Sequence, residues 1–328
     1  MTIKFENIYL KNTSVVAGPF LYNGPLKDKF DSVYKDFYDG ENTFEDCEIK
    51  EIKKSIDILL NKEKKKIKDI NLILGADLTN QLTSCNISVK DKDVPYFGVY
   101  NACASFCEEL IIGSSMLNNK DVNNVMCLTS GHNLTSERQF RSPVEYGCPK
   151  PDYATFTVSA ATATLLDKIE GNIKVESGTI GKVVDLGVTD AFDMGSAMTP
   201  AAAKTLFDHL KETKRDVNYY DLIITGDLGI YGEKIFKEFC KKEYNIELNN
   251  YVDSATLVYN MNDDRVLAGG SGPSCLPAYF FTDIVPKMKE KKLSKVLLLA
   301  TGALFSTTTV NQKKSIPCIC HAVSLEAI

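Results

Sequence analysis

Histidine is scarce in this chain: three of its 328 residues are histidines, and its ten cysteines include no C-x-x-C pair. Structural zinc sites usually draw their ligands from such pairs and from histidines. These counts argue against a tetrahedral zinc site, and we expect no bound metal. The first residues, M-T-I-K-F-E-N, also lack the pattern of a secretory signal. The cysteines are therefore expected to be free thiols in a reducing cytoplasm.

Long apolar runs and an excess of basic residues are both absent. No stretch approaches the ~20 uninterrupted apolar residues of a transmembrane helix, so any association with a membrane is expected to come through partners. The formal net charge is −5 and the pI is about 5.4. Proteins that bind nucleic acid present a basic face, so we expect no nucleic-acid partner. Hydrophobic residues make up 44% of the chain, which supports a large core without disulfides.

Strand-like and helix-like segments alternate along the chain. Residues 69–78, 96–100 and 122–130 have the apolar, β-branched character of buried strands, and residues 103–117 have a helical pattern. This alternation predicts an α/β fold, with a mostly parallel sheet covered by helices.

Two further elements are predicted near the middle of the chain. Residues 151–166 combine β-branched and small side chains, which indicates one closely packed strand. Thr199 is a suitable N-cap and Pro200 suits the first helical position. The sequence therefore predicts a helix that begins at Pro200 and runs to about Glu212.

Two motifs occur twice, in the same order. Residues 72–78 read L-I-L-G-A-D-L and residues 222–228 read L-I-I-T-G-D-L. Residues 125–131 read V-M-C-L-T-S-G and residues 296–302 read V-L-L-L-A-T-G. Two ordered matches predict a duplicated α/β unit.

The duplication divides the chain into residues 1–185 and 186–328, and it sets Cys103 opposite Ser274. Cys103 follows a predicted strand and precedes a predicted helix. At a helix N-terminus the dipole and the free N–H groups can stabilise a thiolate. Two interpretations remain open. Cys103 is either a small core residue or a catalytic nucleophile or its remnant.

The segment of residues 129–147 is the richest in polar side chains. It follows a predicted strand, and α/β sheets place ligand sites at the carboxyl ends of strands. His132 is a loop histidine that needs no core role, and Arg138 and Arg141 carry the planar group that binds carboxylates at two points. The alternative is that the arginines pair with acids such as Glu145 across a loop or a dimer interface.

Three aspartates, Asp185, Asp190 and Asp193, lie in a turn-rich connection. They could bind a cation, but aspartates in such connections more often form helix caps and Asx-turns. Residues 269–274 are rich in glycine without matching a phosphate-binding fingerprint, and they indicate a tight turn before a helix.

These features resemble the stage V sporulation protein AD family of endospore-forming bacteria, within the thiolase and ketoacyl-synthase superfamily. The resemblance spans nearly the whole chain. It rests on the segments G-V-Y-N-A-C-A-S, S-E-R-Q-F-R-S-P-V-E-Y-G, G-K-V-V-D-L-G-V-T-D-A-F-D-M-G-S-A-M-T-P-A-A-A and L-A-G-G-S-G-P-S-C.

The resemblance implies a thiolase-like fold, duplicated in five α-β-α-β-α layers, and a homodimer. It implies binding of dipicolinic acid, pyridine-2,6-dicarboxylic acid, alone or as its calcium chelate. It also implies a role in moving this compound into the forming spore and releasing it at germination. The expected partners are membrane proteins of the same sporulation operon, and the expected location is cytoplasmic or peripheral at the inner spore membrane.

The chain departs from the enzymes of this superfamily in its second half. Condensation needs histidine or asparagine side chains there, to activate the thiol and to hold the enolate. Initiating ketoacyl synthases carry a histidine near the position of Gly226 and an asparagine near that of Gly269. Thiolases carry a second cysteine near Ala300 and a Gly-His-Pro where this chain has Ser271-Gly272-Pro273. These differences predict that Cys103 is a remnant that lines a binding pocket.

We therefore expect a binding protein without condensing activity, and without a cofactor apart from calcium carried by the ligand. Cys103 is expected at the pocket floor, His132 as a donor to a carboxylate, and Arg138 or Arg141 as a two-point carboxylate contact. One rival is an acyltransferase that uses Cys103 with His132 as its base. The other is an adaptor for membrane proteins that binds no small molecule.

Overall fold

Helices and strands alternate along the chain as the sequence predicts. The computed structural model describes residues 1–140 and 150–328, so the predictions for Arg141 and Glu145 lie outside the described residues. The helices are α1 (Phe44–Glu63), α2 (Thr83–Val89), α3 (Ser105–Met116), α4 (Asn133–Phe140), α5 (Met194–Thr213), α6 (Gly229–Tyr244), α7 (Ala255–Val258), α8 (Cys275–Tyr279), α9 (Val285–Lys289) and α10 (Thr307–Asn311). Shorter helical turns cover Leu21–Asn23, Ile67–Asp69, Asn80–Leu82, Val217–Tyr219 and Asp264–Val266, and a π-helical turn covers Phe280–Ile284.

The strands form two sets of five. In spatial order the first set is β2 (Tyr9–Ala17), β8 (Ala160–Asp167), β6 (Asn124–Gly131), β4 (Leu72–Ala76) and β5 (Tyr96–Gly98). The second set is β9 (Ile173–Thr179), β14 (Cys318–Ala327), β13 (Lys295–Ala303), β10 (Leu222–Thr225) and β11 (Tyr251–Asp253). The short strands are β1 (Thr2–Lys4) beside β9, β3 (Ser32–Val33) beside β2, and the separate pair β7 (Phe156–Thr157) and β12 (Gly270–Ser271).

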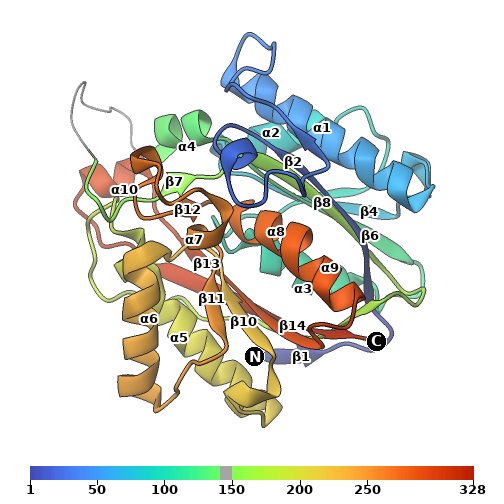
Figure 1. The fold of residues 1–328 in the computed structure, drawn as a ribbon. Helices are drawn as coiled ribbons and strands as arrows, with labels where there is room; N and C mark the ends of the chain where they lie inside the picture. Colours follow the sequence, from blue (N-terminus) through green and yellow to red (C-terminus); the bar gives the residue numbers. More distant parts are fainter. Residues whose placement is uncertain (141–149) are drawn as a thin grey trace.

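The two sets and the helices stack in five layers (Figure 1). Helices α1 and α2 cover the outer face of the first set, α5 and α6 cover the outer face of the second, and α3, α8 and α9 lie between the sets. The sets join at one edge, where Tyr9 and Leu10 of β2 pair with Lys174 and Ile173 of β9. The predicted five-layered α/β fold is confirmed.

Apolar clusters fill the spaces between these layers. The central cluster includes Phe106 of α3, whose ring centroid lies 6.4 Å from that of Phe280. Leu59 of α1 belongs to the outer cluster of the first set, and Leu206 of α5 belongs to that of the second. Each large side chain buried in this way contributes about 1.5–3 kcal/mol, so the packing of the layers holds the pocket walls in place.

The duplication is visible in strand order, strand direction and register. In each set the first three strands are antiparallel neighbours and the last three are parallel neighbours. Leu72 lies opposite Val125 in the first set, and Leu222 lies opposite Val296 in the second. The two repeated motifs therefore occupy equivalent strands. The boundary after residue 185 stays a prediction.

Two predicted elements differ from the structure. The predicted strand over residues 151–166 is divided between β7 and β8, which pair with different strands. Helix α5 begins at Met194 instead of Pro200, because the Asp193 carboxylate caps it by accepting the Ser196 N–H at 3.2 Å. Pro200 lies inside the helix, where the buried packing of α5 against α6 offsets its missing hydrogen bond.

The described helices include none with the length and apolar character needed to cross a bilayer.

Candidate functional site

A pocket lies where the two halves meet. It contains about 490 Å³ of empty space, part of it open to solvent. Leu78 follows β4, Phe305 follows β13, and Met194 and Met198 lie in the first turns of α5. The lining residues are Leu78, Ala102, Cys103, Ser136, Phe140, Thr157, Met194, Met198, Ser271, Gly272, Ala303 and Phe305.

Cys103 lies in the tight turn before α3 and lines this pocket. Its side chain is partly exposed. The preceding Ala102 has a φ of 50°, a left-handed conformation that is uncommon outside glycine. Ala104 closes the turn by donating its N–H to the Asn101 carbonyl at 3.0 Å. The thiol is thus placed at a helix N-terminus, where negative charge is stabilised.

Gly302, at the end of β13, lets the strand approach this turn closely. A β-carbon at Gly302 would lie 2.2 Å from the Asn101 carbonyl oxygen and 3.0 Å from the Ala104 nitrogen. Both contacts are with backbone, which cannot move aside as a side chain can. The position of the Cys103 turn therefore depends on a glycine in the second half.

The chemistry of the pocket wall is apolar with a few hydroxyls. Aromatic and thioether groups come from Phe140, Phe305, Met194 and Met198, and the hydroxyls come from two serines and one threonine. None of the described lining residues is acidic or basic. Such a wall suits a ligand with an apolar surface and a few polar groups that can meet these hydroxyls.

His132 lies away from the pocket wall. It is fully buried at the end of β6, and its Nε2 lies 3.0 Å from the Phe37 carbonyl. Its ring packs between Phe37 and Phe44, with centroids 5.5 Å away in each case. Burial lowers the pKa of His132 to about 4, so the imidazole is neutral at physiological pH. Its role as a carboxylate donor stays a prediction.

Arg138 forms an ion pair with Glu45 of α1. Its side chain is 58% exposed, and it is outside the set of described lining residues. Nearby acids such as Glu145 are the partners that the sequence suggests for the arginines. The observed partner of Arg138, Glu45, instead comes from a segment far away along the chain. Of the predicted ligand contacts within the described residues, the structure brings only Cys103 to the pocket.

His321 lies next to the Cys103 turn, and the sequence did not identify it as a site residue. Its Nε2 lies 3.2 Å from the Asn101 amide nitrogen, and its Nδ1 accepts the Gly181 N–H at 3.2 Å. Burial lowers its pKa to about 4. The antiparallel pairing of β14 with β13 sets His321 opposite Ala300. That register is a tertiary feature, so no local signal could have revealed the contact.

Asp227 is a fully buried carboxyl in the loop after β10. The Gly272 N–H and the Thr301 hydroxyl face it, but neither carboxyl oxygen reaches hydrogen-bond geometry with a described residue. Burial raises the pKa of Asp227 well above its usual range, and the nearby Asp253 carboxyl adds to the rise. Burial therefore favours the protonated form of Asp227, which faces the backbone of Gly272, a residue that lines the pocket.

The three aspartates of the turn-rich connection act within turns. Asp185 accepts the Gly187 N–H at 2.9 Å, and Asp190 accepts the Phe192 N–H at 2.8 Å. Asp193 caps α5. The interpretation of these residues as caps and Asx-turns is confirmed.

Sequence comparisons match the chain to one family over almost its whole length. The family model described as stage V sporulation protein AD matches residues 1–326. Stage V sporulation protein AD of Bacillus subtilis (strain 168) is 38% identical over 323 residues, which are 98% of this chain and 95% of that protein.

Structure comparisons identify solved proteins with a similar fold. OleA from Xanthomonas campestris has a TM-score of 0.64 and 12% identity, with 99% of each chain covered. The 3-oxoacyl-[acyl-carrier-protein] synthase III from Aquifex aeolicus has a TM-score of 0.59 and 14% identity, with 97% of this chain and 99% of that chain covered. At such identities the likeness concerns the fold alone, and it confirms that the fold is thiolase-like.

Proposed function

Because this chain belongs to the stage V sporulation protein AD family, we propose that it binds dipicolinate in the Cys103 pocket and acts in dipicolinate uptake and release by the spore. The observation that carries this proposal is a pocket around Cys103 with an apolar wall and no described base. The fold is shared with condensing enzymes, and the apolar wall supports a binding role.

The aromatic part of the pocket suits a pyridine ring. The rings of Phe140 and Phe305 lie 5.4 Å apart at 48° to one another, and both line the pocket. Met194 and Met198 supply adaptable thioether surface nearby. A flat ring can pack against these groups while its carboxylates face the hydroxyls of Ser136 or Thr157.

The charge of the pocket favours the calcium chelate over the free dianion. Free dipicolinate carries two negative charges, and the described lining residues supply no cation. Burying an unpaired carboxylate is costly. In the chelate the calcium ion neutralises both carboxylates, so the neutral complex loses less hydration energy on entry.

The surroundings of Cys103 support a role without catalysis. The described residues that line the pocket include no histidine and no asparagine. Burial lowers the pKa values of His132 and His321 to about 4, which makes both imidazoles weak bases. Both also lie outside the lining set. Asp227 follows the strand after which initiating synthases carry a histidine, but it is buried and lies outside the lining set, so it is not placed to accept the thiol proton.

Calorimetric titration of the full chain with dipicolinate, with and without calcium, tests this proposal. We expect binding of the chelate at least about tenfold tighter than that of the free acid, which is about 1.4 kcal/mol. In parallel, mass spectrometry after incubation with acetyl-CoA or malonyl-CoA should show no acyl adduct. Rapid acylation of Cys103 with release of product would instead identify an acyltransferase. If the chain neither binds dipicolinate nor is acylated, the result would identify it as an adaptor.

Variants of Arg138 and Arg141 test whether either arginine contacts dipicolinate directly. Arg138→Ala is expected to leave affinity within about threefold, because an exposed ion pair with Glu45 holds this side chain. A loss of at least about 30-fold in Arg141→Ala would assign the two-point contact to that residue. The same loss in Arg138→Ala, with an unchanged melting temperature, would contradict the pocket assignment.

The proposal extends to a homodimer that docks on membrane partners. Strand β5 ends the row of strands and pairs only with β4 among the described strands. Next to this open edge, Phe97 is 51% exposed and Tyr100 is 43% exposed. An unpaired edge with apolar side chains is a typical pairing surface. Sedimentation of the wild-type chain and of Phe97→Glu tests it: the variant should be a monomer.

A further inference from the structure

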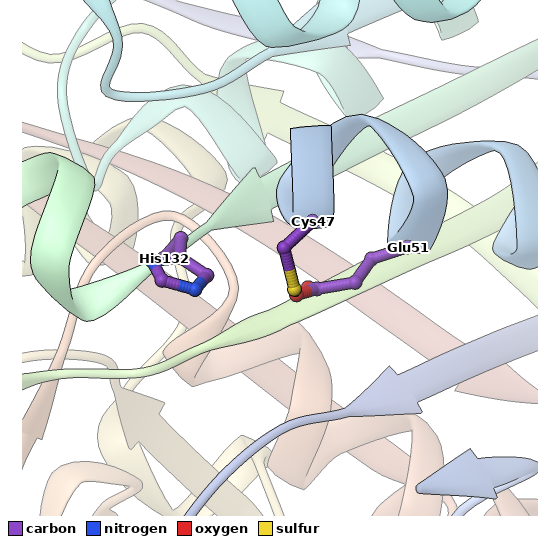
Figure 2. A group of neighbouring side chains, drawn as sticks. All are labelled: Cys47, Glu51 and His132. Atoms are coloured by element: carbon purple, nitrogen blue, oxygen red, sulfur yellow. The ribbon is translucent and has the colours of Figure 1, made fainter. Parts of the chain in front are cut away.

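Three side chains that the pocket does not use meet beneath the N-terminal turns of α1. Figure 2 shows Cys47 and Glu51 extending from successive turns of α1, with His132 beside them at the end of β6. One potential ligand atom from each side chain lies within 4.8 Å of the other two. Cys47 and His132 are 0% exposed and Glu51 is 1% exposed. The cluster is thus a buried set of one sulfur, one oxygen and one nitrogen donor.

Two atoms of this cluster have no hydrogen-bond partner among the described residues: Nδ1 of His132 and Oε2 of Glu51. The Nε2 of His132 lies 3.0 Å from the Phe37 carbonyl. Because a carbonyl only accepts, Nε2 carries the proton and Nδ1 has a free lone pair. Histidine ligands of metals are commonly oriented in this way, with the second ring nitrogen donating to a backbone carbonyl.

We propose that Cys47, Glu51 and His132 bind a divalent transition metal, and that zinc is the ion they fit best. Thiolate, imidazole and carboxylate are all zinc ligands, whereas calcium takes oxygen ligands alone. Tetrahedral zinc places its ligand atoms about 3.3–3.8 Å apart, a spacing that side-chain rotations can reach from the observed one. Three protein ligands leave the fourth position for water.

Charge balance favours such an ion in this place. A thiolate and a carboxylate carry two negative charges, and a neutral imidazole carries none, so a divalent ion makes the buried site neutral. A buried charge without a partner would be strongly unfavourable. The site thus differs in ligand chemistry from any calcium carried by dipicolinate.

A neighbouring carboxylate shows what a satisfied buried acid looks like here. Glu48, next to Cys47 on α1, accepts hydrogen bonds from Ser84 at 3.1 Å, from Ser130 at 2.8 Å and from Thr135 at 3.2 Å. In Glu51, Oε1 is approached by the Tyr34 hydroxyl and by Cys47 Sγ, at 3.4 Å for the sulfur, while Oε2 stays unpartnered. Glu48 therefore provides a matched control for Glu51.

A metal here would fix one wall of the pocket. His132 directly precedes α4, and Ser136 and Phe140 of that helix line the pocket. Bonds to Cys47 and Glu51 would tie the start of α4 to α1. The site would thus have a structural role, and it would act on ligand affinity through the position of Phe140.

Metal binding can be measured directly on the purified full chain. Elemental analysis should find about one zinc per chain, and zinc should raise the melting temperature of chelator-treated protein. Cobalt in place of zinc should give the near-ultraviolet charge-transfer band of a cobalt–thiolate bond. The band should persist in Cys103→Ala, because Cys103 belongs to the pocket and is outside the cluster.

Variants locate the site. Cys47→Ser, Glu51→Gln and His132→Gln should each weaken zinc binding by at least about 100-fold, since even residues behind the ligands affect affinity by about 10–100-fold. Glu48→Gln and Cys240→Ser, both buried and outside the cluster, should bind zinc within about threefold of wild type.

Three results would overturn the proposal. One is the absence of zinc uptake by the folded wild-type chain, and another is a cobalt complex without the thiolate band. The third is zinc affinity that is unchanged in Glu51→Gln, a variant that keeps the size and shape of the side chain. If a variant fails to fold, the cobalt spectrum of the wild-type chain still shows whether a thiolate binds the metal.

Discussion

The two halves of the molecule share a strand order but use equivalent positions differently. Asp77 and Asp227 occupy the same place in the repeated motif. Asp77 accepts the Thr79 N–H at 2.6 Å and the Cys85 N–H at 2.8 Å. Neither carboxyl oxygen of Asp227 accepts a well-formed hydrogen bond from a described residue. In the second half, Asp253 performs the equivalent task by accepting the Gly229 N–H at the start of α6, at 3.1 Å.

The comparison separates two kinds of constraint. Strand register follows from apolar side chains that must face a core, and both halves meet that requirement in the same way. The task of a polar residue depends on the loop beside it. A duplicated scaffold can therefore keep an aspartate in place while its hydrogen bonds pass to another residue.

The largest effect is expected at the equivalent glycines Gly131 and Gly302. Gly302→Ala should destabilise the chain by about 3 kcal/mol, because the new β-carbon would lie 2.2 Å from the Asn101 carbonyl oxygen. Gly131→Ala should cost about 1 kcal/mol or less, because its closest contact is 3.0 Å. Urea unfolding of both variants measures the difference. Equal losses would mean that the Cys103 turn adapts to the strand.

The two aspartates should rank next. Asp77→Ala should cost about 2–3 kcal/mol, since it leaves the buried N–H groups of Thr79 and Cys85 unpaired. Asp227→Ala removes only the weaker approach of the Gly272 N–H and the Thr301 hydroxyl, so it should cost less than about 1 kcal/mol. Denaturant midpoints of the two variants test the ranking, and a larger loss at Asp227 would contradict it.

The pH dependence of stability should also differ at Asp227. Burial raises the pKa of Asp227 in the folded chain, so the folded state holds this proton after the unfolded state has released it. Stability then falls as pH rises from the ordinary aspartate pKa toward the raised value. Asp227→Asn should remove this fall, with a gain in melting temperature that grows as pH rises above the ordinary aspartate pKa of about 4. A gain that is constant across pH would rule out titration as its cause.

The smallest effects are expected at Cys103 and Ser274, the paired positions before the central helices. Ser274→Ala should cost about 1 kcal/mol, because its buried hydroxyl donates to the Ala160 carbonyl at 2.8 Å. Cys103→Ala should change stability by less than about 0.5 kcal/mol, because its partly exposed side chain lines a pocket. Thermal melts of both variants check the order. A larger loss in Cys103→Ala would mean that the thiol has a packing role.

Much of the fold could be predicted because its signals are local or periodic. The repeated motifs identify equivalent strands, and the observed pairing of Leu72 with Val125 and of Leu222 with Val296 agrees with them. The start of α5 could not be read from Pro200, because packing against α6 outweighs the preference of proline for the first turn.

The site was only partly predictable. Cys103 has a local signal, the junction of a strand with a helix. The contact between Arg138 and Glu45 joins segments distant in the sequence, and the cluster of Cys47 and Glu51 with His132 joins α1 to the end of β6. Such neighbours depend on how α1 packs on the sheet, and no pattern within either segment specifies it.

The pairing of the N-terminal strands β1 and β2 with β9 has a consequence for synthesis of the chain. Thr2 in β1 pairs with Thr179 in β9, which lies 177 residues further along the chain and is synthesised that much later. At about 5–20 residues per second, a ribosome needs roughly 9–35 s to supply that partner. The last strand, β14, pairs with both β9 and β13, so the second set closes only when the C-terminus emerges. The N-terminal strands must therefore stay unaggregated during most of translation, which makes early exposure of β2 the most vulnerable stage of folding.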